Sequence, residues 1–342
     1  MTRARMTLSL ESWVGLYLLL YLPNVMVTRW VTTNPHAGLG RPLTGVETLP
    51  ASLILSLVMT YLFIWLSGWH RAANSVSVAG RRIPFPTKYT FISGVGTALI
   101  LFTVPLSFTI RDVSIPFMQL LMRGDILLVA PLLDFLFGRR VHWWSWVALA
   151  MVLGALLLTL SDRGGFNLPP IAILTIVLYT LGYFVRLAVM NRISKTGDPA
   201  SIRRYFVEEK IVALPLSVLA LAAIAASGIG GPTDELYWGF VAVWTDPVMI
   251  ELVVIGLTLT LISIVSIVIL LDPRENAYCV PLERAASLLA GVGGSVLLAL
   301  FWAGAMPSSA ELIGAGILIA AIALLSLAPR FSQSRGAPPR TV

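Results

Sequence analysis

The sequence predicts an all-α polytopic membrane protein whose ten transmembrane helices form two inverted five-helix repeats. Of its 342 residues, 57% are hydrophobic and only 12% are charged, and the mean hydropathy is +0.85. Soluble chains are about one quarter charged. Much of the apolar content gathers in runs of about twenty residues, the length that crosses a bilayer as a helix. This composition excludes soluble enzymes, disordered chains and fibrous repeats, and it makes the lipid bilayer the first partner.

Ten apolar runs are long enough to span the bilayer, and short polar connections separate most of them. The first run follows Arg3 and Arg5 but lacks the small residues of a signal-peptide cleavage site, so we expect it to remain as a membrane helix. The predicted spans are residues 10–28, 50–68, 89–110, 113–137, 143–161, 168–190, 205–228, 247–271, 277–303 and 310–328.

The distribution of Lys and Arg predicts the orientation. With the N-terminus inside, sixteen of the 24 Lys and Arg residues fall in cytoplasmic segments, and only Arg29, Arg41, Arg111 and Arg163 fall outside. An even number of spans returns the C-terminus to the same side, where residues 330–342 are predicted to form a basic disordered tail. We therefore expect a multi-pass protein of the cytoplasmic (inner) membrane with both termini in the cytoplasm.

An internal repeat links the two halves of the chain. Two tyrosines and a polar residue occur at i, i+4 and i+7 in the first and sixth spans, at Tyr17, Tyr21 and Asn24 and, 162 positions later, at Tyr179, Tyr183 and Arg186. Arg123 and Arg284 are separated by 161 positions. The agreement predicts one five-helix repeat over residues 1–165 and a second over 166–329. Because five is odd, the second copy is inverted.

Two segments carry a family resemblance. Residues 133–154 (LDFLFGRRVHWWSWVALAMVLG), echoed by 300–316, resemble the turn between helices 4 and 5 in the drug/metabolite transporter superfamily, in its EamA-type or nucleotide-sugar and triose-phosphate branches. The resemblance extends to the layout of five plus five helices. It implies a central cavity between the halves and alternating access of a small substrate to that cavity.

The fourth predicted span contains charges that a bilayer would not tolerate without a purpose. At 100° per residue, Arg123 and Asp134 lie within about 20° of each other, and Gln119 falls on the same stripe. Asp125 lies on the opposite face. We expect Gln119 and Arg123 to bind substrate, Asp134 to be a candidate for proton coupling, and Asp125 to be a structural charge. A network of ion pairs that holds helices together is the alternative, and the two roles are compatible.

The repeated positions complete the predicted site. Glu283 is predicted to be a structural charge, and Glu208, Glu209 and Lys210 are predicted to form a charge cluster at the membrane interface. The predicted substrate-binding residues are Gln119, Arg123, Tyr17, Tyr21, Asn24, Tyr179, Tyr183, Arg186, Arg284 and Ser287.

The arginines favour a secondary active transporter of a small polar anionic metabolite, because guanidinium groups fit phosphate and carboxylate. A lipid-headgroup flippase and a membrane enzyme acting on a lipid-linked phosphate are the alternatives. No Asp-x-x-Asp pair occurs, the chain has one cysteine, and its three histidines lie between spans. We therefore expect no enzyme activity, no metal or cofactor and no nucleic acid. The expected partners are the bilayer and a small-molecule substrate, with a homodimer left open.

Overall fold

Helices form almost all of the regular structure. The computed structural model describes residues 9–36, 38–78, 80–108, 110, 113–122, 143–162, 168–193, 198–228, 232–272, 276–302 and 306–335.

The described helices follow the predicted spans. Every predicted range except 113–137 falls on a described helix, and residues 115–122 are helical within that range. The elements are α1 (Leu10–Thr33), α2 (Gly45–Leu66), η1 (Trp69–Ala72), β1 (Ser75–Val78), β2 (Arg81–Pro84), α3 (Lys88–Ser107), α5 (Trp143–Asp162), α6 (Pro170–Ile193), α7 (Pro199–Ser227), α8 (Pro232–Val241), η2 (Ala242–Thr245), α9 (Met249–Leu270), α10 (Asn276–Trp302) and α11 (Ser309–Arg335).

Seven helices within the described residues are long and apolar enough to cross a bilayer, namely α1, α2, α3, α6, α7, α9 and α10. Large apolar side chains such as Leu19, Leu219 and Leu300 lie on the outside of the bundle and are 64–66% exposed. A soluble protein rarely exposes so much apolar surface, whereas lipid accepts it. The chain is therefore a polytopic helical membrane protein that also carries one short hairpin.

Polar side chains fix the points at which helices begin. Thr44 and Glu47 form a reciprocal capping box at the start of α2. At the start of α7, Asp198 accepts hydrogen bonds from the backbone N–H groups of Ala200 and Ser201, and these bonds hold the pKa of Asp198 below its usual range. Because Pro199 suits the first position of a helix, α7 begins well before its apolar run.

Three features differ from the sequence-based prediction. The connection over 69–88 contains an antiparallel hairpin, in which β1 pairs with β2 and Gly80 adopts a positive φ of 78°. The connection over 229–246 contains α8. In addition, α11 continues to Arg335, beyond the point where a disordered tail was expected. The alternating Ser and Val residues of β1, followed by a glycine, were the signal for the hairpin.

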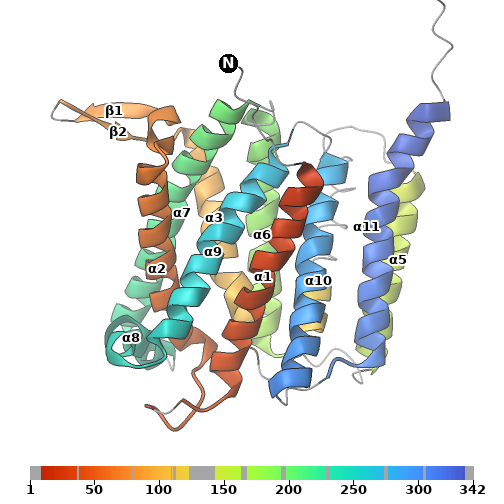
Figure 1. Ribbon diagram of the computed structural model, residues 1–342, viewed down its shortest axis with the longest axis horizontal. Coiled ribbons are helices and arrows are strands. Elements are labelled where there is room, and N and C mark those ends of the chain that lie inside the picture. The colour runs from red at the N-terminus through yellow and green to blue at the C-terminus, as the bar shows by residue number, and fades with distance from the viewer. Residues whose placement is uncertain are drawn as a thin grey trace, which may run out of the picture.

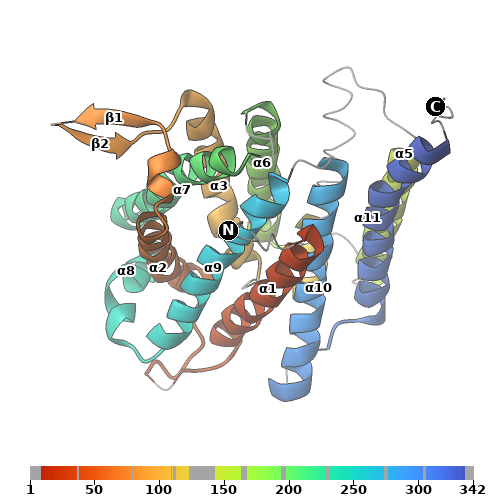
Figure 2. The same cartoon turned by 45° about the horizontal axis from the view of Figure 1, so that its top comes forward.

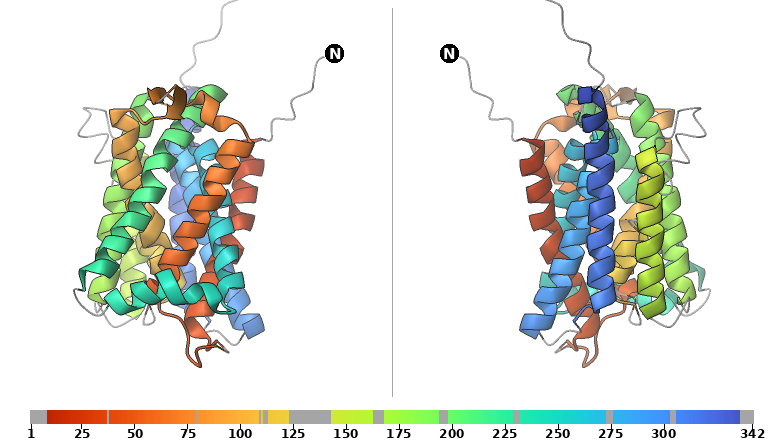
Figure 3. Two further views of the ribbon diagram at one scale, coloured as in Figure 1. Left: turned by 90° about the vertical axis from the view of Figure 1, so that its left-hand side faces the viewer. Right: turned by 90° about the vertical axis from the view of Figure 1, so that its right-hand side faces the viewer.

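The helices form a bundle in which α3 and α9 each pack against two other helices (Figures 1 and 3). Helix α3 packs against α6 and α7, and α9 packs against α1 and α2. Helices α5 and α11 pair at one edge of the bundle, where α11 also contacts α10 (Figure 2). The beginning of α1, the hairpin and the end of α11 lie at one end of the bundle, and α8 lies at the other (Figure 1).

Glycines allow the closest of these crossings. A Cβ atom added to Gly96 of α3 would lie 2.8 Å from the carbonyl oxygen of Gly182 of α6, and one added to Gly182 would lie 2.5 Å from the carbonyl oxygen of Gly96. Backbone cannot move aside as a flexible side chain can. The contact between α3 and α6 therefore requires a glycine at both positions.

We expect Gly182→Ala to destabilise the protein by about 1–3 kcal/mol, because the added methyl group forces the two helices apart. Gly154 of α5 is the matched control, since an added Cβ there has no neighbour within 4 Å. Gly154→Ala should leave stability unchanged or increase it. Unfolding in detergent by a denaturant series measures both, and equal stability of the two variants would contradict the close crossing.

Candidate functional site

A small cavity lies between the two halves of the chain. Its volume is about 60 Å³, which holds a few water molecules. Helices α1 and α3 from the first half, and α6, α7 and α9 from the second half, contribute its walls. The lining residues are Tyr17, Tyr21, Asn24, Thr97, Ile100, Leu101, Val104, Tyr183, Arg186, Lys210, Leu259, Ile262, Ser263 and Ser266.

Five of the predicted substrate-binding residues meet at this cavity. Tyr17, Tyr21 and Asn24 lie on one face of α1, while Tyr183 and Arg186 lie on one face of α6. Five of the six residues in the repeated pattern therefore border one central space, and the sixth, Tyr179, is not among the lining residues. The rings of Tyr17 and Tyr21 are 5.4 Å apart between centroids, and both residues are buried.

Asn24 ties α1 to α9. Its Nδ2 donates to the Oγ1 of Thr258 at 2.8 Å and to the carbonyl oxygen of Ile255 at 3.3 Å. Its Oδ1 is buried and accepts no hydrogen bond within the described residues. A buried amide oxygen without a donor costs free energy. It is therefore ready to accept a hydrogen bond from water or from a ligand in the cavity.

Arg186, which lines the cavity, belongs to a buried ion pair. The Nε of Arg186 lies 2.8 Å from the Oε1 of Glu209, and the two side chains are 4% and 0% exposed. Thr97 of α3 donates to the same carboxylate at 2.6 Å, and Tyr205 donates to it at 3.3 Å. Three helices thus converge on one carboxylate. The attraction and the hydrogen bonds together offset the desolvation of the two charges.

Lys210 adds a second cation beside this pair. Its Nζ lies 3.9 Å from the Oε2 of Glu209, beyond hydrogen-bonding distance, and 5.8 Å from the centroid of the Phe206 ring. The side chain is 2% exposed and lines the cavity. The ammonium therefore carries a positive charge that Glu209 shares with Arg186. It is the cation in this cluster that is free to engage a further anion.

The charge cluster predicted at Glu208, Glu209 and Lys210 is not exposed, because all three residues are buried among neighbouring elements. The prediction assumed that α7 begins next to them. Helix α7 begins at Pro199, so at 1.5 Å per residue these residues lie about 15 Å along it. Asp198-Pro199, a cap followed by a first-turn proline, was the signal that could have placed them inside.

A second ionic group borders the same cavity. The guanidinium carbon of Arg284 lies 3.7 Å from the centroid of the Tyr183 ring, and its Nη1 donates to the hydroxyl of Tyr179 at 2.5 Å. The Nη2 of Arg284 lies 3.7 Å from Glu283, which accepts a hydrogen bond from Ser266. Tyr183 and Ser266 line the cavity. The charges at Arg284 and Glu283 therefore lie just behind its wall.

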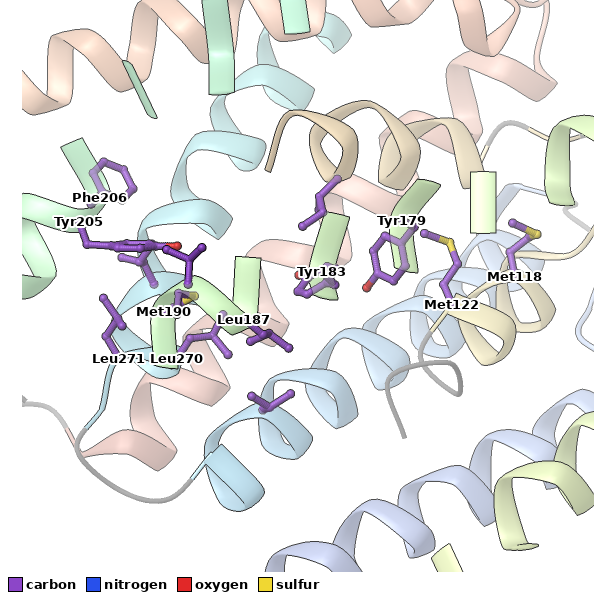
Figure 4. Packing of buried hydrophobic residues seen from close by; sticks show 14 of the residues in the cluster. Met118, Met122, Tyr179, Tyr183, Leu187, Met190, Tyr205, Phe206, Leu270 and Leu271 are labelled. Carbon is purple, nitrogen blue, oxygen red and sulfur yellow. The ribbon is translucent and has the colours of Figure 1, made fainter. Parts of the chain in front are cut away.

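Arg284 retains unused donors. Its Nε and Nη2 are buried and make no hydrogen bond within the described residues. The rings of the two tyrosines that it contacts are 4.8 Å apart and tilted by 55°, and they pack with Met118 and Met122 (Figure 4). A guanidinium over the face of the Tyr183 ring gains a cation–π interaction, which is strongest where water is excluded.

We expect Tyr179→Phe to destabilise the protein by about 1–3 kcal/mol, because the buried Nη1 of Arg284 loses its acceptor. Tyr237 of α8 is 62% exposed, so Tyr237→Phe provides a control with the same chemical change. Urea or dodecyl sulfate titration of both variants measures the difference. If Tyr179→Phe unfolds no more easily than Tyr237→Phe, the hydroxyl does not hold Arg284.

The remaining predicted residues do not line the cavity, or they lie beyond the described part. Gln119 packs on α10, where a Cβ at Gly291 would lie 2.9 Å from its Cγ. Ser287 donates to the carbonyl oxygen of Arg284 in its own helix. Arg123, Asp125 and Asp134 lie outside the described residues.

A larger cavity of about 340 Å³ lies toward the end of the bundle opposite the hairpin, between the end of α1, residues 114–116 and the end of α10. Arg29 reaches across this end, and its Nη1 donates to the carbonyl oxygens of Phe108 and Ile110 at 3.0 and 3.2 Å. Trp30 and Trp302 meet edge to face at 5.9 Å beside it. Within the described residues, no three His, Cys, Asp or Glu side chains form a cluster suited to a metal.

Comparison with known proteins adds information about the fold. No protein-family model matches the chain, and no curated protein matches it. A solved structure described only as "Crystal structure of protein" is similar, with a TM-score of 0.50 and 16% sequence identity. The match covers 96% of this chain and 99% of that one. The likeness thus concerns the helical arrangement of the whole chain, and at this identity it shows the fold alone.

Proposed function

We propose that the protein is a secondary active transporter that carries a small polar anion across the cytoplasmic membrane by alternating access. The observation that carries this proposal is the cavity between the halves, whose wall includes Lys210 and Arg186, two cations that share the single carboxylate of Glu209 behind them. This cluster has a net charge of +1, whereas Glu283 and Arg284 balance each other. A buried excess of positive charge is costly unless an anion relieves it.

The packing of the halves supports the inverted repeat. Under exchange of the two repeats, α3 corresponds to α9, and the pair α6 and α7 corresponds to α1 and α2. Both sets of contacts occur. Gly94 of α3 approaches Val212 of α7, and Gly256 of α9 approaches Leu55 of α2. Gly94 and Gly256 are 162 positions apart, which is the separation of the repeated tyrosines.

The matching contacts in the two repeats support an arrangement of ten spans, with residues 113–137 as the fourth span and both termini inside. They also support membership of the drug/metabolite transporter superfamily as a proposal. In such an arrangement, rocking of one repeat against the other opens the midplane site to each side in turn. The central cavity is small here, and the cavity of about 340 Å³ beside Arg29 marks the path toward the outside.

Ligand stabilisation followed by transport tests the proposal. Purified protein is heated with glycerol 3-phosphate, inorganic phosphate, succinate, leucine or tetraphenylphosphonium at equal ionic strength. We expect the anions alone to raise the unfolding temperature, because only they relieve the positive cluster. The best anion should then exchange across proteoliposomes that contain the protein.

Two results would overturn the proposal. If tetraphenylphosphonium stabilises the protein and no anion does, the site binds cations and not anions. Movement of a fluorescent phospholipid between leaflets, with no anion exchange, would instead identify a flippase. Empty liposomes and liposomes with heat-inactivated protein are the controls.

A further inference from the structure

The hairpin formed by β1 and β2 has two chemically different faces. Val76 pairs with Ile83, and Ser77 pairs with Arg82. Because successive residues of a strand point to opposite faces, Val76 and Ile83 share one face with Phe85, and Ser77 and Arg82 share the other. Val76, Ile83 and Phe85 are 45%, 49% and 57% exposed. The hairpin thus presents an apolar face that no described part of the chain covers.

A single carboxylate fixes the orientation of that face. Asn74 pairs with Phe85, as the bond from the Phe85 N–H to the Asn74 carbonyl shows, so its side chain shares the apolar face. Its Nδ2 and backbone N–H donate to the Oε1 of Glu208 at 2.8 and 3.0 Å, and Thr87 closes the other end of the hairpin on the Oε2 of Glu208. Glu208 is buried within the span of α7. The apolar face therefore points along the bundle toward the bilayer.

The position and the charge of the hairpin indicate what covers this face. The hairpin projects sideways from the end of the bundle, beyond α2 and α7 (Figures 1 and 2). Exposed cations lie on the hairpin and on the helices at this end of the bundle, while Asp198 is an exposed acid at the start of α7. The exposed cations are Arg71, Arg82, Lys88, Arg192, Arg203 and Arg204.

We propose that the hairpin lies flat on the bilayer, with Val76, Ile83 and Phe85 inserted among the acyl chains and with Arg71 and Arg82 bound to anionic phospholipid headgroups. An amphipathic element beside a helical bundle gains both apolar burial and electrostatic attraction at this depth. The proposal depends on the chain spanning a membrane and is independent of transport. It also makes Glu208 the link between the lipid surface and the next residue, Glu209, which pairs with Arg186 and Lys210 of the cavity wall.

Depth-dependent quenching tests the orientation. Val76→Cys and Ser77→Cys are made separately, labelled with a nitrobenzoxadiazole fluorophore and placed singly in nanodiscs that contain lipids spin-labelled on the acyl chain. The unlabelled parent is the blank, because its only cysteine, Cys279, is buried. We expect quenching at position 76 to be several-fold stronger than at 77. Equal quenching, or stronger quenching at 77, would overturn the proposal.

Lipid composition tests the headgroup partner. Replacing phosphatidylglycerol with phosphatidylcholine should reduce quenching of the label at position 76. Arg82→Gln should weaken the dependence on phosphatidylglycerol roughly fivefold, as about 1 kcal/mol for each basic residue near the surface implies. Strong quenching that ignores phosphatidylglycerol would remove the headgroup from the proposal. Label-to-label transfer in discs with two copies, with no quenching in discs with one, would instead assign the face to a second copy.

Discussion

Lys210→Met should abolish anion transport and leave the protein as stable as the parent, or more stable. Lys210 lines the cavity, and its Nζ lies 3.9 Å from Glu209, so among the described residues it makes no hydrogen bond that the fold would lose. Its removal leaves Arg186 and Glu209 as a neutral pair at 2.8 Å. A buried charge in excess of its counterions carries a desolvation cost, so replacing it with an apolar side chain of similar size removes that cost while the remaining pair stays balanced.

The anion, in contrast, loses its main countercharge. Truncation of one partner of a buried charge pair costs about 2–5 kcal/mol, so the apparent affinity should fall roughly 30-fold or more. The measurements are exchange in proteoliposomes and ligand stabilisation with the best anion. Lys88→Met is the matched control, since Lys88 is an exposed lysine at the start of α3. Lys210→Arg, which keeps the charge, should retain part of the binding.

Unchanged exchange by Lys210→Met would remove this lysine from the path and with it the main argument for an anionic substrate. If Lys210→Met loses both stability and anion exchange, the ammonium has a structural role. Comparison of the unfolding temperatures of the methionine and arginine variants separates the two cases.

Glu209→Gln should have the largest effect on stability. The substitution leaves the guanidinium of Arg186 and the ammonium of Lys210 buried without a counterion, although Thr97 and Tyr205 retain an acceptor. Breaking a buried pair from one side costs about 3–5 kcal/mol. We expect a loss of this size in denaturant titration, or a protein that does not survive extraction into detergent.

The matched control is Glu251→Gln in the first turn of α9. One carboxylate oxygen of Glu251 is buried without a hydrogen bond in the described residues. Loss of the negative charge at this position should change the free energy of unfolding by at most about 1 kcal/mol, through the helix dipole. The double variant Arg186→Met/Lys210→Met tests the cause of the loss. Adding Glu209→Leu to it should recover stability, because no buried charge of the cluster then remains. If the triple variant stays as unstable as Glu209→Gln alone, lost hydrogen bonds and not unpaired charge explain the defect.

The sequence alone determined where the chain can enter the bilayer and which helical faces meet. Hydropathy placed the helices because a span needs a fixed length of apolar residues, whatever packs around it. The i, i+4, i+7 spacing brought Tyr17, Tyr21 and Asn24 to the cavity with Tyr183 and Arg186, because that spacing lies on one face of any helix. Hydropathy and helical spacing are local properties, so they can be predicted without knowing which helices lie nearby.

Only the tertiary structure decided which charges are buried and which partners they find. An apolar run gives the minimum length of a span. Helix α7 begins at Pro199, six residues before the predicted span of 205–228, and its Glu208 and Glu209 find donors on the hairpin, α3 and α6. The neighbour of Gln119 is Gly291 of α10, a contact that its own helix does not reveal. The partners of a polar side chain come from elements far away in the sequence. The depth at which a helix tolerates charge is therefore set by those elements and not by its own residues.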